Sequence, residues 1–247
     1  MRPLTVSALA LVCLSLLGQG AAAEIRSMAE CRARITEDPA MAREEAAQWL
    51  TLDGGPEARV CTAETLIALG ARTSAAQMLT ATADDRNNGL PAASRARLMR
   101  DAGRLWLDED QPRLAMETFT RTIQLTGSDP DTLVLRAEAQ GRLGLWQSAM
   151  TDLDRALKQD ANRADILALR AAARRKSEDP TGGLEDAEAA LELQPDLPEA
   201  LFEKGASLAV LGRMPEALDV WFRLIELDPE SQLAKLAQRN MQRLSGN

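Results

Sequence analysis

The sequence predicts an all-α fold, a right-handed α-solenoid of antiparallel helix pairs, chiefly because a 34-residue period runs through its C-terminal half. Small residues recur at this spacing in two series: Ala115, Ala149, Gly183 and Ala217, and Gly103, Ala137, Ala171 and Gly205. Large apolar residues recur in the same way, at Met99, Leu133, Leu167 and Leu201. Small side chains let two helices approach closely and large ones fill the remaining space, so the pattern indicates stacked helix pairs.

Helix breakers divide this region into four units. Each unit should hold two helices joined by a short turn, over residues 96–129, 130–163, 164–197 and 198–231. Prolines lie at or near the boundaries, at Pro130, Pro195, Pro198 and Pro229. They support these boundaries because the residue before a proline disfavours the helical conformation. Gly144 occupies the predicted turn of the second unit, since glycine readily adopts positive φ. An apolar stripe then marks the second helix of that unit, at Ala149, Leu153, Ala156 and Leu157.

These units resemble the tetratricopeptide repeat family. The clearest match is unit 198–231, with Ala200-Leu201, Gly205, Leu211-Gly212-Arg213, Ala217, Trp221 and Leu227-Asp228-Pro229. Unit 164–197 departs from the family at its turn, where Gly182-Gly183 should weaken the following helix by ~1 kcal/mol per glycine relative to alanine. The resemblance covers residues 96–231. It implies that the chain binds a protein or peptide in a groove lined by the first helix of each unit, with no cofactor.

Both flanks of the four units read as further helices. Residues 24–95 should form divergent N-terminal repeats: one pair over 25–36 and 40–52, a second from Pro56 to about Asp85, and then a loop over 84–95. Residues 232–247 should form a capping helix with apolar residues at Leu233, Leu236, Met241 and Leu244. Such a helix shields the apolar end of a solenoid from water.

The N-terminal segment, 1–23, has the pattern of a secretory signal peptide. Arg2 precedes an apolar stretch over residues 4–17, and Ala21-Ala22-Ala23 offers a cleavage site after Ala23. The alternative is an uncleaved membrane anchor, but the apolar stretch is too short to span a bilayer comfortably. No second apolar segment of spanning length follows. The sequence therefore predicts an exported bacterial protein, periplasmic or secreted, with no membrane span after cleavage.

Two cysteines, Cys31 and Cys61, would remain after cleavage. In an oxidising compartment they are candidates for a disulfide that ties the first helix to the third. In the chain-entropy account, a bond that closes a loop of this size contributes about 3 kcal/mol. The alternative is a pair of buried free thiols.

Composition excludes several classes of function. The formal net charge is −8, which argues against nucleic acid and anionic membrane surfaces as main partners. The chain has no histidine, so it cannot form a Ser-His-Asp site, a Cys-His site or a histidine metal site. Phosphate-binding loops, HExxH and CxxC motifs are absent from the sequence. Carboxylate-based catalysis stays formally open, but we expect no enzyme, cofactor or metal.

Two arginine–aspartate pairs recur in register. Arg136 and Asp152 are separated by the same interval as Arg170 and Asp186 in the next unit. Each pair should face across the two helices of its own unit, where a bidentate contact fixes the geometry. We interpret the pairs as packing elements, with ligand binding as the alternative. The tryptophans are expected in the core, at Trp49, Trp106, Trp146 and Trp221.

The resemblance places a set of side chains in the partner groove: Arg97, Arg100, Arg104, Val134, Glu138, Ala168, Ala172, Phe202 and Ala206. The three arginines lie along one helix face and, by the resemblance, could receive an acidic peptide or a C-terminal carboxylate. Their alternative is a solvated charged face balanced by Asp101 and Asp108. The apolar residues of the last unit could instead be buried against the C-terminal helix.

We therefore expect a non-enzymatic scaffold or adaptor of the cell envelope that binds a protein or peptide partner. One alternative is a helical protein that binds or processes envelope glycans, although the chain has few aromatic residues. A second alternative is a structural protein that associates with itself. The sequence leaves the partner and the oligomeric state open.

Overall fold

The computed structural model describes residues 25–245, and within this range the chain is an all-α solenoid. Its helices are α1 (Met28–Glu37), α2 (Pro39–Thr51), α3 (Gly55–Ala68), α4 (Arg72–Asp84), α5 (Ala92–Asp108), α6 (Pro112–Thr126), α7 (Pro130–Arg142), α8 (Trp146–Gln159), α9 (Ala164–Lys176), α10 (Pro180–Leu193), α11 (Pro198–Val210), α12 (Met214–Leu227) and α13 (Gln232–Ser245). The predicted signal peptide, 1–23, and its cleavage site after Ala23 lie outside the described residues. Within 25–245, no helix combines the length and apolar character needed to cross a bilayer.

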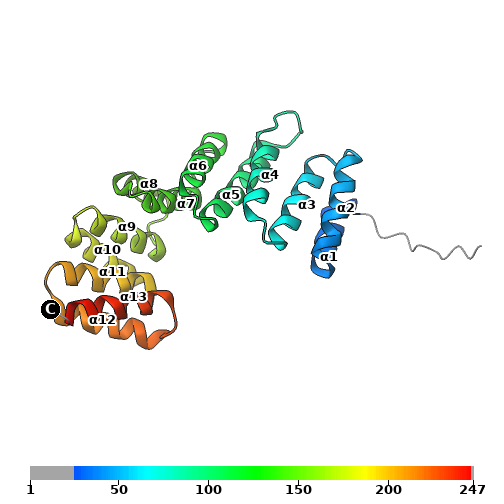
Figure 1. The fold of residues 1–247 in the computed structure, drawn as a ribbon. Coiled ribbons are helices and arrows are strands. Elements are labelled where there is room, and N and C mark those ends of the chain that lie inside the picture. The colour runs from blue at the N-terminus through cyan, green and yellow to red at the C-terminus, as the bar shows by residue number, and fades with distance from the viewer. Residues whose placement is uncertain (1–24, 246–247) are drawn as a thin grey trace, which may run out of the picture.

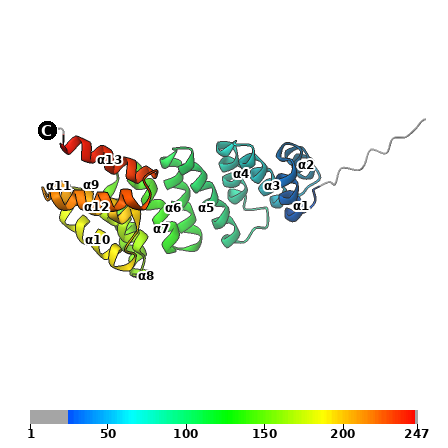
Figure 2. The same cartoon turned by 90° about the horizontal axis from the view of Figure 1, so that it is seen from below.

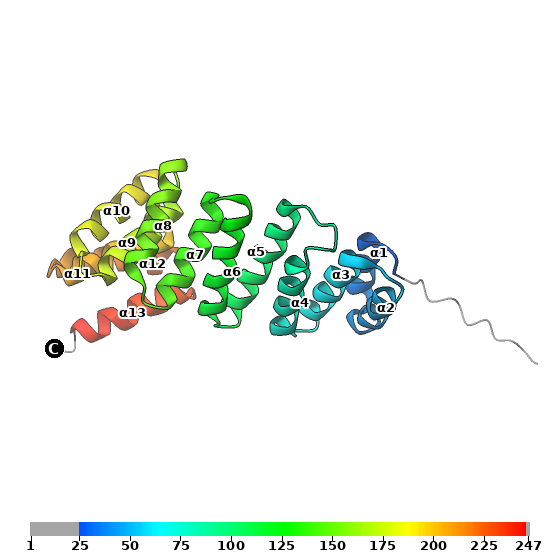
Figure 3. The same ribbon diagram turned by 90° about the horizontal axis from the view of Figure 1, so that it is seen from above.

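Consecutive helices pack side by side along the whole array. Figure 1 shows the helices from α1 to α6 following one another in a row, after which the array turns so that α10 to α13 lie below the row. The views from below (Figure 2) and from above (Figure 3) show the same order. Each helix contacts its neighbours in sequence, and several odd-numbered helices also touch the next odd-numbered helix, most extensively α9 and α11. This nearest-neighbour arrangement is the one that the 34-residue period predicted.

Helix boundaries in the repeats follow local capping chemistry. Asp129 precedes α7, and its Oδ1 accepts a hydrogen bond of 3.0 Å from the backbone N–H of Thr132. Pro130 then occupies the first turn, where no intrahelical donor is needed. At the other end, Gly144 has a φ of 73°, which allows the chain to reverse into α8. The predicted turn of this unit is therefore confirmed.

The connection between α4 and α5 is shorter than the predicted loop over 84–95. Helix α4 includes Asp84 and α5 begins at Ala92, so the loop covers 85–91. The side chain of Asn88 orders this loop, because its Nδ2 donates to the carbonyl of Thr82 at 2.6 Å and its Oδ1 accepts from the N–H of Leu90 at 3.0 Å. Local side-chain hydrogen bonds of this kind compete with helix formation inside the loop.

A disulfide joins the first and third helices. The sulfur atoms of Cys31 and Cys61 are 2.04 Å apart, and both residues are fully buried. They lie in a small core with Ile25, Ala42 and Trp49. The bond therefore closes the N-terminal end of the solenoid around a core that is separate from those of the later repeats.

Candidate functional site

A pocket of about 290 Å³ opens between α7 and α9, with the start of α8 as one wall. Small buried residues leave the space unfilled, namely Ala137, Ala149 and Ala173. Larger apolar side chains border it, namely Trp146, Leu153 and Leu169. Two residues from the predicted groove, Glu138 and Ala172, also line it. The pocket is thus an apolar hollow on the surface shared by the first helices of two units.

The two charged side chains that line this pocket are paired with each other. An Nη2–H group of Arg142 donates to Oε1 of Glu138 at 2.6 Å. The Nη1 group of Arg142 donates to the carbonyl of Leu107 at 2.6 Å, which caps the last turn of α5. The rim therefore carries no net charge and ties α7 to α5.

Charged groups also hold the N-terminal ends of α7 and α9. Arg163 donates to both carboxylate oxygens of Asp165 at 2.8 and 2.7 Å, and to Oδ1 of Asp131 at 3.0 Å. These hydrogen bonds lower the pKa of the Asp165 carboxyl. The two helices are bridged at this end, whereas the pocket lies toward the C-terminal end of α7.

The corresponding space between α9 and α11 is filled. Gly183 of α10 lies so close to both helices that an added Cβ would be 3.0 Å from the carbonyl oxygen of Ala171 and 3.1 Å from Oγ of Ser207. An ion pair covers this contact, because Nε and Nη2 of Arg175 bind the carboxylate of Glu203 at 2.7 and 3.1 Å. The close approach of three helices thus leaves little room for a side chain at 183.

Both glycines at the start of α10 are in close contact with neighbouring groups. Helix α10 begins at Pro180, and Oδ1 of Asp179 caps it by accepting from the N–H of Gly182 at 2.9 Å. A Cβ at Gly182 would lie 2.2 Å from Oδ2 of the same aspartate. Alanine at 182 would have to displace the capping carboxylate, and alanine at 183 would press on the carbonyl of Ala171, so these contacts act in addition to the helix propensity predicted from the sequence.

Three of the predicted groove residues are buried. Phe202 and Ala206 are 7% exposed and belong to the same core cluster as Ala237 of α13, which is the alternative that the sequence left open. Ala168 is 2% exposed and packs in a cluster with Ala200 of α11. Val134 is partly buried in the core under α7 and α8. Phe202, Ala206 and Ala168 are covered because α11 packs against both α9 and α13.

The predicted arginine ladder is interleaved with carboxylates. Arg100 lies 3.5 Å from Asp129, and Arg104 lies 3.5 Å from Asp101. Burial raises the pKa of the Asp101 carboxyl, an effect that the guanidinium groups of Arg104 and Arg100 oppose. Arg97 is exposed and borders a separate hollow of about 240 Å³ between α1, α3 and α5. Arg100 and Arg104 thus form the balanced charged face, with Asp129 in the place predicted for Asp108.

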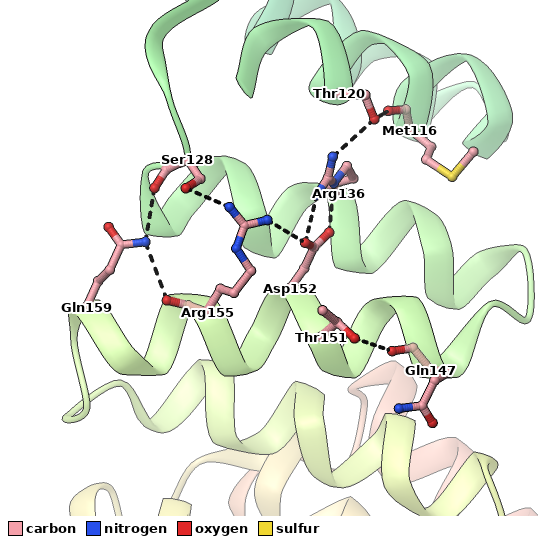
Figure 4. A network of polar contacts seen from close by, with 9 residues as sticks. All are labelled: Met116, Thr120, Ser128, Arg136, Gln147, Thr151, Asp152, Arg155 and Gln159. Atoms are coloured by element: carbon pink, nitrogen blue, oxygen red, sulfur yellow. Dashed lines mark hydrogen bonds and ion pairs between the residues drawn. The ribbon is translucent and has the colours of Figure 1, made fainter. Parts of the chain in front are cut away.

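The arginine–aspartate pairs are packing elements that join units as well as helices. Arg136 binds Asp152 through Nε and Nη2 (Figure 4), and both contacts measure 2.7 Å. Its Nη1 also donates to Oγ1 of Thr120 in the preceding unit at 3.3 Å. Arg170 repeats this arrangement, with Asp186 on one side at 2.6 and 2.8 Å and Asp154 on the other at 2.7 Å.

The contacts to the preceding unit were missed by the sequence analysis, although a signal for them exists. Thr120 precedes Arg136 by the same interval as Asp154 precedes Arg170. A search for polar partners on both sides of each arginine would have found them. Trp146 packs against the core as predicted, but it is only half-buried, which the sequence does not indicate.

Solved structures of other proteins share this architecture. No family model and no curated protein matches the sequence. The chain superposes with a TM-score of 0.65 on a tetratricopeptide repeat protein from Parabacteroides merdae, at 17% identity, over 77% of this chain and 73% of that one. YrrB, a tetratricopeptide repeat protein with an unusual peptide-binding site, matches with a TM-score of 0.57 at 16% identity, over 74% of this chain and 91% of that one.

A third structure, MamA, matches with a TM-score of 0.57 at 16% identity, over 66% of this chain and 92% of that one. The similarity in structure agrees with the phased 34-residue units and with the recurring positions of small residues within this chain. The protein therefore has the tetratricopeptide repeat fold.

Proposed function

We propose that this protein is a non-enzymatic scaffold of the bacterial cell envelope that binds a segment of a partner protein across α7 and α9. The pocket between these helices carries the proposal, since it is an apolar hollow that the described part of the array leaves open between two units. Binding sites of this kind are concave and mostly apolar, with few polar groups. The similarity to YrrB, which has a peptide-binding site, supports the same use of this fold.

Two features support a location in the envelope. The N-terminal segment, 1–23, has the composition of a signal peptide. The disulfide between Cys31 and Cys61 is of the kind that forms and persists in an oxidising compartment. The formal net charge of −8 favours a protein partner over nucleic acid or an anionic membrane surface.

Site-specific crosslinking in living cells tests this function. A diazirine-bearing aliphatic residue in place of Leu169 would react with whatever lies in the pocket. The matched control carries the same residue in place of Leu193, which is 46% exposed at the end of α10. We expect one dominant adduct with an envelope protein from position 169 and none from position 193. Equal labelling from both positions, or no adduct from position 169, would contradict the proposed function.

A further inference from the structure

We propose that the pocket between α7 and α9 selects one bulky aromatic side chain of the partner segment, which takes the place of a side chain that the repeat itself lacks. This inference rests on the proposed function and names the chemistry of its ligand. It follows from comparing three successive junctions, α5/α7, α7/α9 and α9/α11, position by position along the 34-residue period.

The pocket corresponds in register to the contact that is filled in the next junction. Each residue of the α9/α11 contact has an equivalent one 34-residue period earlier in the sequence. In every case this equivalent residue lines the pocket. The ion pair of Arg175 and Glu203 is replaced by Gly141 and Leu169. The remaining equivalents are Ala137, Ala149 and Ala173. The pocket is therefore the same junction without its filling groups.

The preceding junction is filled in a different way. One further period back, Gly141 becomes Leu107 and Leu169 becomes Leu135. Leu107 is 4% exposed, and Leu135 packs against the same core cluster. An apolar side chain thus fills this space between α5 and α7, and an ion pair fills it between α9 and α11. Only the middle junction of the three depends on a group from outside.

The charge of the pocket indicates a neutral side chain. Its two charged residues, Glu138 and Arg142, satisfy each other at 2.6 Å. A charged side chain would lose its hydration here without gaining a counter-ion, which is unfavourable. A neutral apolar side chain complements this uncharged, apolar hollow.

The size of the pocket and one of its walls favour an aromatic group. An apolar cavity of roughly 150 Å³ accommodates one benzene ring, and this pocket measures about 290 Å³. Trp146 is half-buried at the pocket wall, whereas the other three tryptophans are at most 9% exposed. Its ring lies against the bare backbone of Gly141, since a Cβ there would be 3.3 Å from Cζ3. An incoming ring can therefore pack on Trp146.

The chain itself offers one exposed aromatic residue that could enter this pocket in a second copy. Within the described residues, Phe222 is 54% exposed, and every other phenylalanine or tryptophan apart from Trp146 is buried. No phenylalanine, tryptophan or tyrosine occurs among residues 1–24. In keeping with the proposed function we assign the occupant to a different protein, and Phe222 provides the means to test a second copy as the other source.

The test uses the purified protein with its disulfide intact and three capped amino acids as probes. The four tryptophans provide four indole N–H signals by NMR, and the Trp146→Phe variant identifies the one from the pocket. We expect N-acetylphenylalaninamide to shift this signal with a Kd on the order of 1 mM. It should bind about two- to tenfold more tightly than N-acetylleucinamide, and N-acetyllysinamide should not bind. Equal binding of all three probes, or no shift with phenylalaninamide, would overturn the inference.

A variant with a filled pocket tests whether the probe and the partner bind at the same place. Gly141→Leu restores the residue found at Leu107, and Lys158→Leu adds the same side chain at an exposed position of α8 as a control. We expect Gly141→Leu to abolish probe binding and to reduce the crosslinked partner at least tenfold, with the control unchanged. Partner capture that survives Gly141→Leu would overturn the pocket inference and leave the scaffold function standing. Probe binding without any partner in cells would instead overturn the scaffold function.

A final measurement separates a partner from a second copy. We expect light scattering to give the same mass for the wild-type protein and Phe222→Ala, and both to bind the probe equally. An oligomer that dissociates on Phe222→Ala and then binds the probe more tightly would show that a second copy fills the pocket, which would overturn the assignment to a different protein.

Discussion

The α7/α9 and α9/α11 junctions are built from the same positions of the repeat, yet one is open and the other is closed. In the closed junction Gly183 lets α10 approach the carbonyl of Ala171, and Arg175 and Glu203 span the gap. In the open junction the residue equivalent to Gly183 is Ala149, and the bridging pair is replaced by Gly141 and Leu169. The difference shows that small residues alone do not close a junction. A pair of longer side chains must also span the gap between the two helices.

The same comparison explains why the groove predicted along all four units is shorter than expected. Packing of α11 against α9 and α13 buries Phe202 and Ala206, while the space above Ala172 stays accessible. Each junction can therefore be opened or closed by a few side chains without changing the period. Variants that open, close or loosen a junction test whether a few side chains decide its packing. The variant with the largest expected effect on stability comes first.

Leu107→Ala should open the α5/α7 junction in the way that Gly141 opens α7/α9. Leu107 is 4% exposed, so its truncation leaves a cavity and should lower the free energy of unfolding by about 2–5 kcal/mol. Urea denaturation followed by circular dichroism measures this change. A loss below about 1 kcal/mol would mean that the leucine does not fill the junction.

Arg175→Met should destabilise the closed junction by about 3 kcal/mol, because Glu203 would be left without its counter-ion at 11% side-chain exposure. The double variant Arg175→Leu/Glu203→Leu copies the apolar pair of α5/α7 and should recover most of the loss. Thermal unfolding of the single and double variants at pH 7 provides the comparison. If the double variant is as unstable as the single one, the two junctions are not interchangeable.

Gly183→Ala and Gly141→Ala form a matched pair with opposite expected effects on the free energy of unfolding. At 183 the new methyl group meets backbone and a buried hydroxyl at 3.0 and 3.1 Å, so we expect a loss of about 1–3 kcal/mol. At 141 the nearest atom, 3.3 Å away, belongs to Trp146 beside the hollow, so we expect no loss and a gain of up to about 1 kcal/mol in helix propensity. Equal effects in chemical denaturation would contradict the difference between the junctions.

Acid should loosen the bridged N-terminal end of the open junction. Hydrogen bonds from Arg163 lower the pKa of the Asp165 carboxyl in the folded protein below its pKa in the unfolded chain. The contact therefore contributes its full stability at any pH above the unfolded pKa. This contribution is lost as the pH falls through the folded pKa. Asp165→Asn should remove this contribution, about 0.5 kcal/mol for a half-exposed pair at pH 7. Stability measured between pH 7 and pH 3 should therefore fall less steeply in the variant. Parallel curves for the two proteins would show that the bridge has no energetic role.

The period made the fold predictable, because the same pair of helices, with small and large residues at the same positions, is repeated in each unit. It also made the pairs of Arg136 and Arg170 predictable, since the second repeats the first one period later. The pocket was not predictable in the same way. Gly141 and Ala173 look like ordinary small residues in the sequence, and only the structure shows that they face one another across two units. Burial of Phe202 likewise depends on where α13 lies, which the 34-residue pattern does not specify.

The disulfide near the N-terminus makes the two ends of the array differ in their resistance to unfolding. In a solenoid each unit is held only by its neighbours, so unravelling begins at a free end and moves inward. The bond between Cys31 and Cys61 fastens one end covalently, and the other end is held only by the packing of α13 on α11 and α12. Fraying should therefore start at α13, so amide exchange and proteolysis would reach the pocket from the C-terminal side while the N-terminal helices stay protected.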